Sequence, residues 1–186
     1  MTKVSNAETK RKNTENRTGK MKTTTRTKAR NKPKGFVFAL FILLALCSCD
    51  QSKIFEQNVS FPDNIWLTKN KLAFEVVIED TSSVHNVIFN IRNTDLYKYN
   101  NLWLFINTTF PDGTVFNDTI DYALANETGA WLGDGLGGFY GLKVPYRLKV
   151  KFPASGTYRF VIQQAMRENK LIGISDFGLR IEKTSI

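Results

Sequence analysis

The sequence of 186 residues is poor in sulfur and imidazole, with two cysteines, three methionines and one histidine. A single histidine excludes metal sites that need two, and it leaves a Ser-His-Asp triad dependent on His85 alone. His85 follows a polar turn at the start of a predicted strand, where a histidine is usually a surface or strand-end residue, so hydrolase chemistry is not indicated. We therefore expect a protein that is not an enzyme and that holds no metal and no cofactor.

The sequence also lacks an apolar run long enough to cross a bilayer, which takes about 20 residues. Its longest run, at residues 36–46, has 11 apolar residues and ends just before Cys47 and Cys49. Signal-peptide cores have about 7 to 15 apolar residues after a positive flank and end at small residues. The run therefore predicts a signal peptide. Because no cysteine follows Cys49, the body of the protein has no disulfide and depends on packing for its stability.

An excess of positive charge is present only at the N-terminus. Residues 1–34 hold 12 basic and 2 acidic side chains, whereas the rest of the chain holds 14 basic and 15 acidic ones. The body thus has no excess positive field to attract phosphates. This balance argues against nucleic acid as a partner.

The sequence Leu-Cys-Ser-Cys at residues 46–49 resembles the lipobox of bacterial lipoproteins. The small Ser48 precedes Cys49, which we expect to carry the lipid; an ordinary secretory signal is the alternative. The chain then divides into a basic region at 1–35 with a possible start at Met21, a signal core and lipobox at 36–48, and a lipid-anchored domain at 49–186. Several acyl chains would attach the domain to a membrane without any apolar protein surface.

Apolar and polar side chains alternate along several segments of this domain, which is the period-two pattern of half-buried strands. The clearest segments are residues 72–78, 87–91, 144–152, 158–162 and 177–181. Turn residues separate the segments at 61–64, 80–83, 111–113 and 153–156. Only 119–126 and 163–170 are compatible with short helices, and the second is equally compatible with a hairpin. The pattern predicts an all-β single domain, an antiparallel β-sandwich that is jelly-roll-like.

The three tryptophans, together with Tyr97, Tyr99 and Tyr140, are candidates for stacking on a sugar. Residues 102–106 are continuously apolar, which predicts a strand covered on both faces with Trp103 in the core. Trp66 and Trp131 lie in polar or glycine-rich surroundings. We expect these two at the surface.

A glycine-rich stretch at residues 131–141 contains Gly-x-Gly-x-x-Gly, but a strand-like segment follows it where a nucleotide loop needs a helix. One interpretation is a tight turn in which glycine supplies positive φ. Another is a partner-binding loop, because glycine beside large aromatic rings makes an adaptable contact surface. For that interpretation the candidate contact residues are Trp131, Gly133, Gly135 and Tyr140, together with Arg167 further along the chain.

Acidic side chains gather at Asp112, Asp118, Asp121, Glu127 and Asp134. Carboxylates of this kind hold Ca²⁺ in some sandwich loops, but none has the spacing of a calcium loop, and solvated turn residues are the simpler interpretation. A glycosidase pair would depend on a separation that sequence does not give.

Asp118-Thr119-Ile120 resembles the site at which Bacteroidota glycosylate exported proteins on a hydroxyl. Thr119 is therefore a candidate for O-glycosylation.

Residues spread along the domain resemble the gliding-motility lipoprotein GldH family of Bacteroidota. The resemblance is carried by Cys49, Phe61-Pro62, Ile65-Trp66, Ile91-Arg92-Asn93, Tyr97-x-Tyr99-x-Asn101-Leu102-Trp103, Asp118-Thr119, Gly129-x-Trp131-x-Gly133-x-Gly135, Gly156-x-Tyr158, Gln164-Ala165-Met166-Arg167, Leu171-x-Gly173-Ile174 and Gly178-Leu179. The resemblance implies an accessory lipoprotein of the envelope machinery for gliding and the linked type IX secretion system, and it implies no catalytic residues.

Residues and resemblance together predict a non-catalytic lipoprotein of the cell envelope, lipid-anchored in the outer membrane. Its partners would be the membrane and other envelope proteins of motility or secretion, contacted through residues 131–141 and the Arg167 region. The alternative is a glycan-binding surface or periplasmic lipoprotein that uses Trp66 or Trp131.

Overall fold

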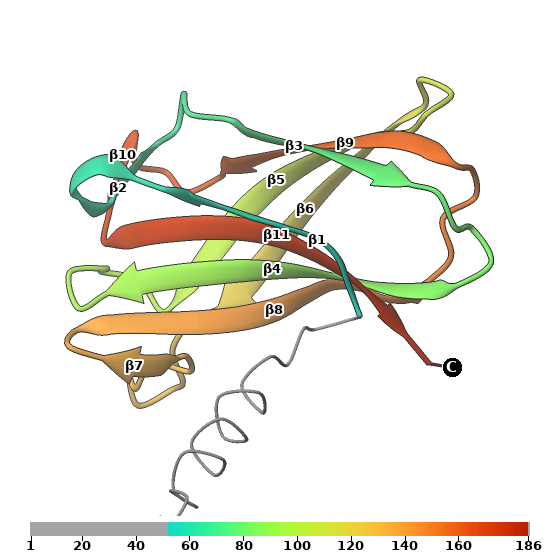
Figure 1. The fold of residues 1–186 in the computed structure, drawn as a ribbon. Coiled ribbons are helices and arrows are strands. Elements are labelled where there is room, and N and C mark those ends of the chain that lie inside the picture. The colour runs from blue at the N-terminus through green and yellow to red at the C-terminus, as the bar shows by residue number, and fades with distance from the viewer. Residues whose placement is uncertain (1–51, 186) are drawn as a thin grey trace, which may run out of the picture. The chain divides into compact units, whose positions relative to one another are not determined.

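The alternating segments form strands in a computed structural model that describes residues 52–185 (Figure 1). The predictions for Met21, the signal core and Cys49 lie outside the described residues. One 3₁₀ turn, η1 (Pro62–Asn64), accompanies the strands. These are β1 (Lys53–Ser60), β2 (Ile65–Leu67), β3 (Leu72–Ile78), β4 (Val84–Thr94), β5 (Asn101–Thr109), β6 (Val115–Ala123), β7 (Asp134–Leu136), β8 (Phe139–Val150), β9 (Gly156–Gln164), β10 (Lys170–Ile172) and β11 (Ile174–Thr184).

Two antiparallel sheets face each other across a shared core, which confirms the predicted sandwich (Figure 1). One sheet has the order β1-β11-β4-β8-β7 and the other the order β3-β9-β5-β6, while β10 pairs with β2 alone. If the eight longest strands are numbered in chain order, the sheets have the orders 1-8-3-6 and 2-7-4-5. This is jelly-roll connectivity, in which strands far apart in sequence become neighbours.

The strands form where the sequence alternates, and their buried residues meet between the sheets. In β3 every second residue is buried, beginning with Leu72. The core is rich in aromatic rings. The ring centroid of Phe89 on β4 lies 5.2 Å from that of Phe177 and 5.0 Å from that of Tyr146 on β8. Burial of each such side chain contributes about 1.5–3 kcal/mol, which a domain without disulfides needs.

The end of β8 departs from the expected alternation. The alternation over residues 144–152 predicts that Leu148 points inward, together with Val144 and Tyr146, but Leu148 is 56% exposed. Lys149 adopts a φ of 53°, and the register between β4 and β8 shifts beside it. This irregularity acts as a β-bulge and turns Leu148 to the outer face.

Neither predicted short helix forms. Residues 119–123 belong to β6, where pairing with β5 decides the conformation. Residues 163–170 leave β9, cross a loop and enter β10. They make no hairpin either, because β10 pairs with β2. Among residues 52–185 there is consequently no helix that could cross a membrane.

Candidate functional site

The glycine-rich stretch forms a β-hairpin, with β7 and β8 paired from Leu136 and Phe139 onward. The two residues between them, Gly137 and Gly138, have φ values of 64° and 80°. Two successive positive φ angles define the turn that best matches strand twist in a two-residue hairpin, and glycine adopts them without strain. The tight-turn interpretation is confirmed for this part of the stretch.

Gly133 and Gly135 allow close packing inside the same hairpin. A Cβ on Gly133 would lie 2.8 Å from the carbonyl oxygen of Gly141, and one on Gly135 would lie 2.4 Å from the Tyr140 ring. Tyr140 in turn packs against Trp131, with ring centroids 5.8 Å apart. Four of the candidate contact residues thus lie together, and the two glycines are needed for the hairpin's own packing.

A chain of aromatic rings connects this hairpin to the neighbouring loops at one end of the sandwich. Trp131 packs against Tyr97 at 6.3 Å, and Tyr97 packs against Tyr99 at 5.7 Å. The Tyr99 hydroxyl donates a hydrogen bond of 2.7 Å to Glu168, which lies next to Arg167. Burial raises the pKa of Tyr97, whose hydroxyl donates to a backbone carbonyl.

Arg167 lies in the loop after β9, apart from the hairpin residues. Gln164, which is fully buried, holds this loop: its amide nitrogen donates to Glu168 O at 2.8 Å, and its side-chain oxygen accepts from Met166 N at 2.8 Å. Arg167 lines a separate hollow of about 530 Å³ with Tyr99. Sequence reasoning missed the role of Gln164, because a buried glutamine has no signature until its partners are known.

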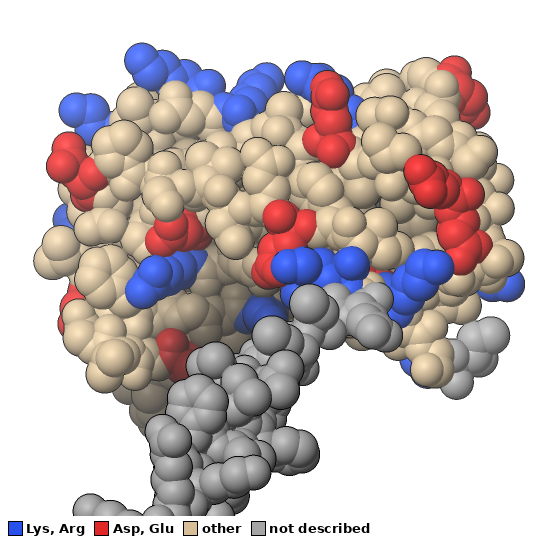
Figure 2. Space-filling view, viewed as in Figure 1, with Lys and Arg blue, Asp and Glu red and all other residues tan. Residues whose placement is uncertain are grey.

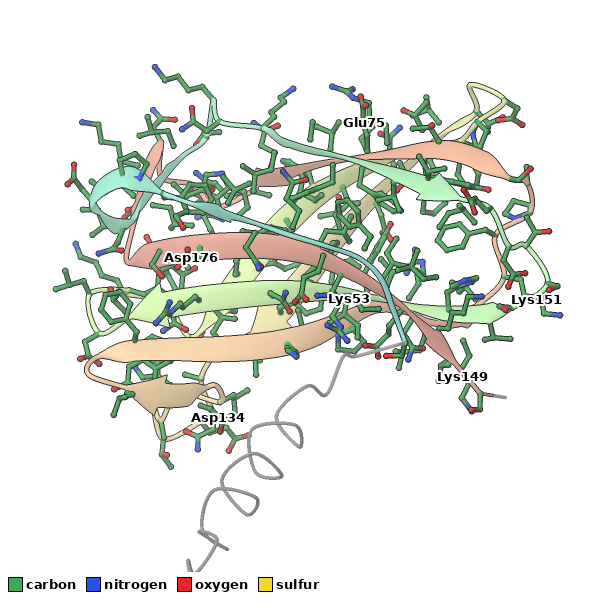
Figure 3. All side chains as sticks on the ribbon, in the orientation of Figure 1. Lys53, Glu75, Asp134, Lys149, Lys151 and Asp176 are labelled. Carbon is green, nitrogen blue, oxygen red and sulfur yellow. The ribbon has the colours of Figure 1, made fainter. Side chains whose placement is uncertain are left out.

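The outer face of the five-stranded sheet carries a hollow of about 710 Å³, which we call the sheet hollow. Figure 2 shows this face hollowed and shadowed, with acidic and basic side chains near the depression. Figure 3 places Asp176 on β11 and Asp134 on β7, with β4 and β8 between them. The lining residues are Asn58, Asn90, Ile91, Arg92, Leu132, Asp134, Gly141, Leu142, Lys143 and Asp176.

Cross-strand register places the polar lining residues in two rows. One row runs from Asp176 through Arg92 and Gly141 to Asp134. Three strand spacings of about 4.8 Å separate its ends, so the row is about 14 Å wide. A Cβ on Gly141 would meet nothing closer than 4.0 Å, so the missing side chain deepens the row at its centre.

The second row runs from Asn58 through Gly178 and Asn90 to Lys143. The Asn58 side chain lies directly over Gly178: a Cβ added to Gly178 would stand 1.8 Å from the side-chain oxygen of Asn58. That oxygen accepts a hydrogen bond of 3.2 Å from the Asn90 amide. The two rows together present amides and charges of both signs.

Charges in the first row are held by neighbours. The Arg92 guanidinium lies 5.0 Å from the centroid of the Phe139 ring and 4.0 Å from Asp176. Asp176 also accepts a hydrogen bond from the Ser60 hydroxyl. Arg92 is therefore fixed by a ring and a carboxylate, while Lys143 projects from the second row.

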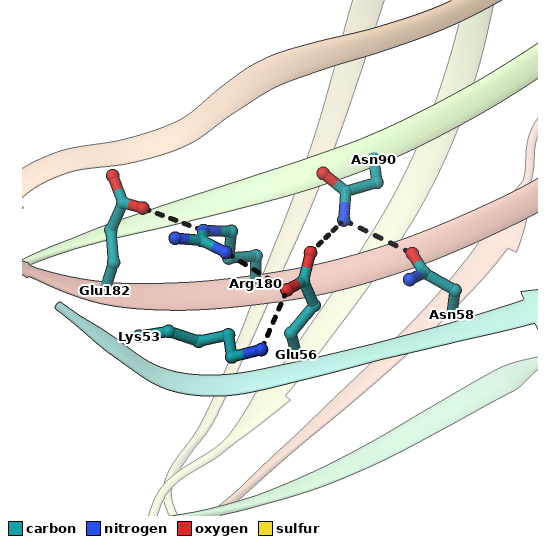
Figure 4. Close-up of polar contacts among 6 residues, drawn as sticks. All are labelled: Lys53, Glu56, Asn58, Asn90, Arg180 and Glu182. Atoms are coloured by element: carbon teal, nitrogen blue, oxygen red, sulfur yellow. Dashed lines mark hydrogen bonds and ion pairs between the residues drawn. The ribbon is translucent and has the colours of Figure 1, made fainter. Parts of the chain in front are cut away.

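A partly buried ionic network, centred on the buried Arg180, adjoins the sheet hollow (Figure 4). Arg180 contacts Glu56 at 3.0 Å and Glu182 at 2.8 Å, and Asn90 donates to Glu56 at 3.2 Å. Burial alone would raise the pKa of Glu56, but Arg180, Asn90 and Lys53 outweigh it, so the pKa lies below its usual value. Because Asn90 belongs to both the network and the lining, the network fixes the floor of the hollow.

His85 lies at the second position of β4, as expected of a strand-end residue, but the surface prediction is wrong because its side chain is fully buried. Its ring packs against Phe152 at 5.3 Å, and neither ring nitrogen has a hydrogen-bond partner. Burial lowers the pKa of His85. The hydroxyl of nearby Ser83 donates to Asp80 and not to the His85 ring, so these residues do not form the serine–histidine pair of a hydrolase.

The gathered acidic residues do not come together. Asp118 pairs with Arg147 at 2.5 Å, Asp121 accepts from Asn101, and Asp112 accepts from a backbone amide within its turn. In residues 52–185 no three histidine, cysteine or carboxylate side chains stand close enough to hold a metal ion.

Two predictions about tryptophan are wrong. Trp66 is fully buried, stacked on Phe61 at 4.9 Å, so it cannot bind a sugar. Trp103 is 42% exposed, because β5 buries only the alternate residues, beginning with Leu102, and leaves the other face open. The apolar run that suggested a doubly covered strand instead supplies one buried and one exposed apolar face. Trp131 is half-buried.

Thr119 is exposed on β6, which is an edge strand of its sheet. It lies directly across from Phe105 of β5. The position is sterically open to a modifying enzyme.

The range of residues that matches known proteins covers most of the β-sandwich domain. The profile of the family described as GldH lipoprotein matches residues 53–181. The "Gliding motility lipoprotein GldH homolog" of Christiangramia forsetii is 37% identical over 156 residues, covering 80% of this chain and 94% of that protein. The "Gliding motility lipoprotein GldH" of Flavobacterium johnsoniae is 32% identical over 151 residues, covering 77% and 93%. A crystal structure of dimeric latent PorU from Porphyromonas gingivalis has 6% identity, covers 71% of this chain and 13% of its own, and has a TM-score of 0.31, which is too low to support an argument.

Proposed function

Because the chain belongs to the GldH lipoprotein family, we propose that it is a non-catalytic, lipid-anchored component of the envelope machinery for gliding and the linked type IX secretion system. Lipid on Cys49 would hold it in the outer membrane, and the β-sandwich would contact other proteins of that machinery. The names of both relatives support motility, and the lipobox supports the anchor.

The sheet hollow is the surface that best supports a protein contact. Its rows combine amide groups, a lysine, an arginine and two carboxylates, and Leu132 adds an exposed apolar side chain. This mixture suits a polar segment of a protein, which offers backbone groups to amides and charged side chains to both signs. The predicted contact stretch, residues 131–141, supplies one wall of the hollow through Leu132, Asp134 and Gly141.

A non-catalytic role is supported by the placement of the groups that acid–base chemistry needs. His85 is enclosed in the core, and the carboxylates of the sheet hollow are paired with, or separated by, cations. An arrangement of this kind recognises charge and does not present a nucleophile beside a base.

The test is charge reversal at Lys143, which lines the hollow, with Lys149 on the same strand as the matched control. A photo-crosslinking residue at Leu132 should capture a motility or secretion protein in living cells. Lys143→Glu should reduce that cross-link several-fold and slow spreading of gliding colonies, whereas Lys149→Glu should leave both unchanged. Equal cross-linking in the two variants would contradict the assignment of the hollow.

A further inference from the structure

The outer face of the four-stranded sheet carries a second surface, centred on two adjacent aromatic side chains of β5. Trp103 is 42% exposed and Phe105 is 51% exposed, two residues apart on the same face of the strand. Exposed aromatic rings side by side on a sheet are costly to leave in water and mark binding surfaces. We call these two rings and their polar neighbours the β5 platform.

Polar side chains adjoin the rings at both ends along the strand. Beyond Trp103, the Asn101 amide donates to both oxygens of Asp121, at 2.8 and 3.0 Å. Beyond Phe105, the Asn107 amide donates to Asn117 at 2.7 Å. These bonds fix the orientation of the four side chains and leave the amide oxygens of Asn101 and Asn107 able to accept further hydrogen bonds.

Neighbouring strands add polar groups beside the rings. Asp121 lies directly across from Trp103 on β6, and Thr119 lies directly across from Phe105. Gln163 of β9 pairs with Phe105 on the other side and is held by a bond from its amide to Thr68 O at 2.8 Å. Each ring is therefore in reach of hydroxyl, amide or carboxylate groups on the adjacent strands.

Two hollows continue the platform along β5. One, of about 530 Å³, lies between Trp103 and Arg167, and the other, of about 220 Å³, lies beside Phe105 and Asn107. From Asn101 to Asn107 the strand covers about 20 Å at 3.3 Å per residue. The surface is thus an elongated track with rings at its centre.

We propose that the β5 platform binds a neutral polysaccharide chain. A sugar ring has an apolar C–H face that stacks on an aromatic ring and a rim of hydroxyl groups that bond to amides and carboxylates. The platform presents both kinds of group along one strand: polar pair, ring, ring, polar pair. The proposal is independent of the protein contact assigned to the sheet hollow, which lies on the other sheet.

The surroundings of Asp121, beside Trp103, favour a glycan over a protein partner. The carboxylates of the sheet hollow share its lining with Arg92 and Lys143, whereas Asp121 is bound by the neutral amide of Asn101. A carboxylate held in this way can accept further hydrogen bonds, and sugar hydroxyl groups can donate them.

The experiment titrates the full-length lipoprotein in detergent micelles with soluble neutral polysaccharides: a β-glucan, an α-mannan and a xylan. Trp103→Ala and Phe105→Ala are compared with Trp103→Phe, which keeps a ring, and with Val77→Ala, which removes an exposed apolar side chain from β3. Binding is measured by calorimetry, and folding by circular dichroism.

At least one polysaccharide should bind saturably to the unmodified protein. Loss of one stacking contact worth about 0.5–1.5 kcal/mol should weaken binding about 2- to 12-fold in each alanine variant. Trp103→Phe should weaken it less, and Val77→Ala should leave it unchanged. The proposal is overturned if the whole panel fails to bind, if the double variant Trp103→Ala/Phe105→Ala binds as tightly as the unmodified protein, or if cross-linking from the platform captures only protein.

Discussion

Replacement of Arg180 by methionine tests the ionic network that supports the sheet hollow. The Arg180 side chain is 9% exposed, and its guanidinium lies 3.0 Å from Glu56 and 2.8 Å from Glu182. Methionine keeps the length and packing of the side chain but removes the charge. The substitution therefore leaves Glu56 partly buried with only Lys53 and Asn90 beside it among the partners described above.

The size of the loss follows from burial. A hydrogen bond to a charged group contributes about 1.5–3 kcal/mol, and removal of one partner of a fully buried pair costs about 3–5 kcal/mol. Both carboxylate side chains retain 23% exposure, so water replaces part of what Arg180 supplied. We expect Arg180→Met to reduce the free energy of unfolding by about 2–3 kcal/mol near pH 7, within the range set by those two limits.

The loss should depend on pH in a predictable direction. In the unmodified protein the pKa of Glu56 is lowered, so its ionised form adds stability above the ordinary glutamate pKa, and that stability disappears as the pH falls through the folded value. Arg180 is the largest of the causes that lower this pKa, so its removal raises the pKa of Glu56 relative to the unmodified protein. Protonation then relieves the variant, so its deficit should shrink between about pH 7 and about pH 4.

Urea unfolding followed by tryptophan fluorescence measures the free energy of unfolding of each protein at the two pH values. Trp66 reports on unfolding because it is buried in the core. Arg159→Met is the matched control: its ion pair with Glu75 at 3.8 Å is largely exposed, and exposed pairs contribute about 0–1 kcal/mol. A deficit for Arg180→Met that is equal at the two pH values, or no larger than that of Arg159→Met, would refute this account of the network.

Four further outcomes follow from single side chains. Burial lowers the pKa of His85, so as the pH falls below about 6.5 the unfolded state binds a proton at this residue before the folded state does, and stability declines. His85→Phe should make this decline in unfolding free energy less steep, and an unchanged slope would contradict the explanation. Trp66→Ala should destabilise the domain by about 3–5 kcal/mol in urea unfolding followed by circular dichroism, and a loss below about 1 kcal/mol would show that the residue is not core. Cys49→Ser should abolish incorporation of labelled palmitate and release the protein from membranes, and retention of either property would disprove lipidation there. Thr119→Ala should remove any mass that mild β-elimination releases from the native protein, and equal loss in both forms would exclude Thr119 as the glycosylated residue.

The alternation of apolar residues was sufficient to predict most strands and the sandwich. A buried face needs apolar groups at every second position, and this requirement is written directly in segments such as 72–78 and 158–162. The turns at 61–64 and 153–156 could be predicted as well, because proline, glycine and aspartate limit the backbone locally.

The local sequence pattern gave the wrong exposure for residues whose burial depends on packing against distant parts of the chain. The apolar run at 102–106 has apolar residues on both faces, so only the packing of residues 52–185, which leaves one of these faces uncovered, shows that Trp103 and Phe105 face outward. Trp66 has polar sequence neighbours, yet the rings of Phe61 and Phe177 enclose it from elsewhere in the chain. Exposure is a property of the packed sheets, which no window of sequence contains.

By itself the sequence determined the composition of the chain, the Leu-Cys-Ser-Cys segment that resembles a lipobox, the strand-forming segments and the residues that carry the resemblance to the GldH family. Only the tertiary structure decided which side chains meet: jelly-roll connectivity brings Asn58, Asn90 and Asp176 from three distant strands onto one face. Sites on a sheet are assembled across strands, and the register of strands far apart in sequence is fixed by burial of the whole core, not by the residues that form the site.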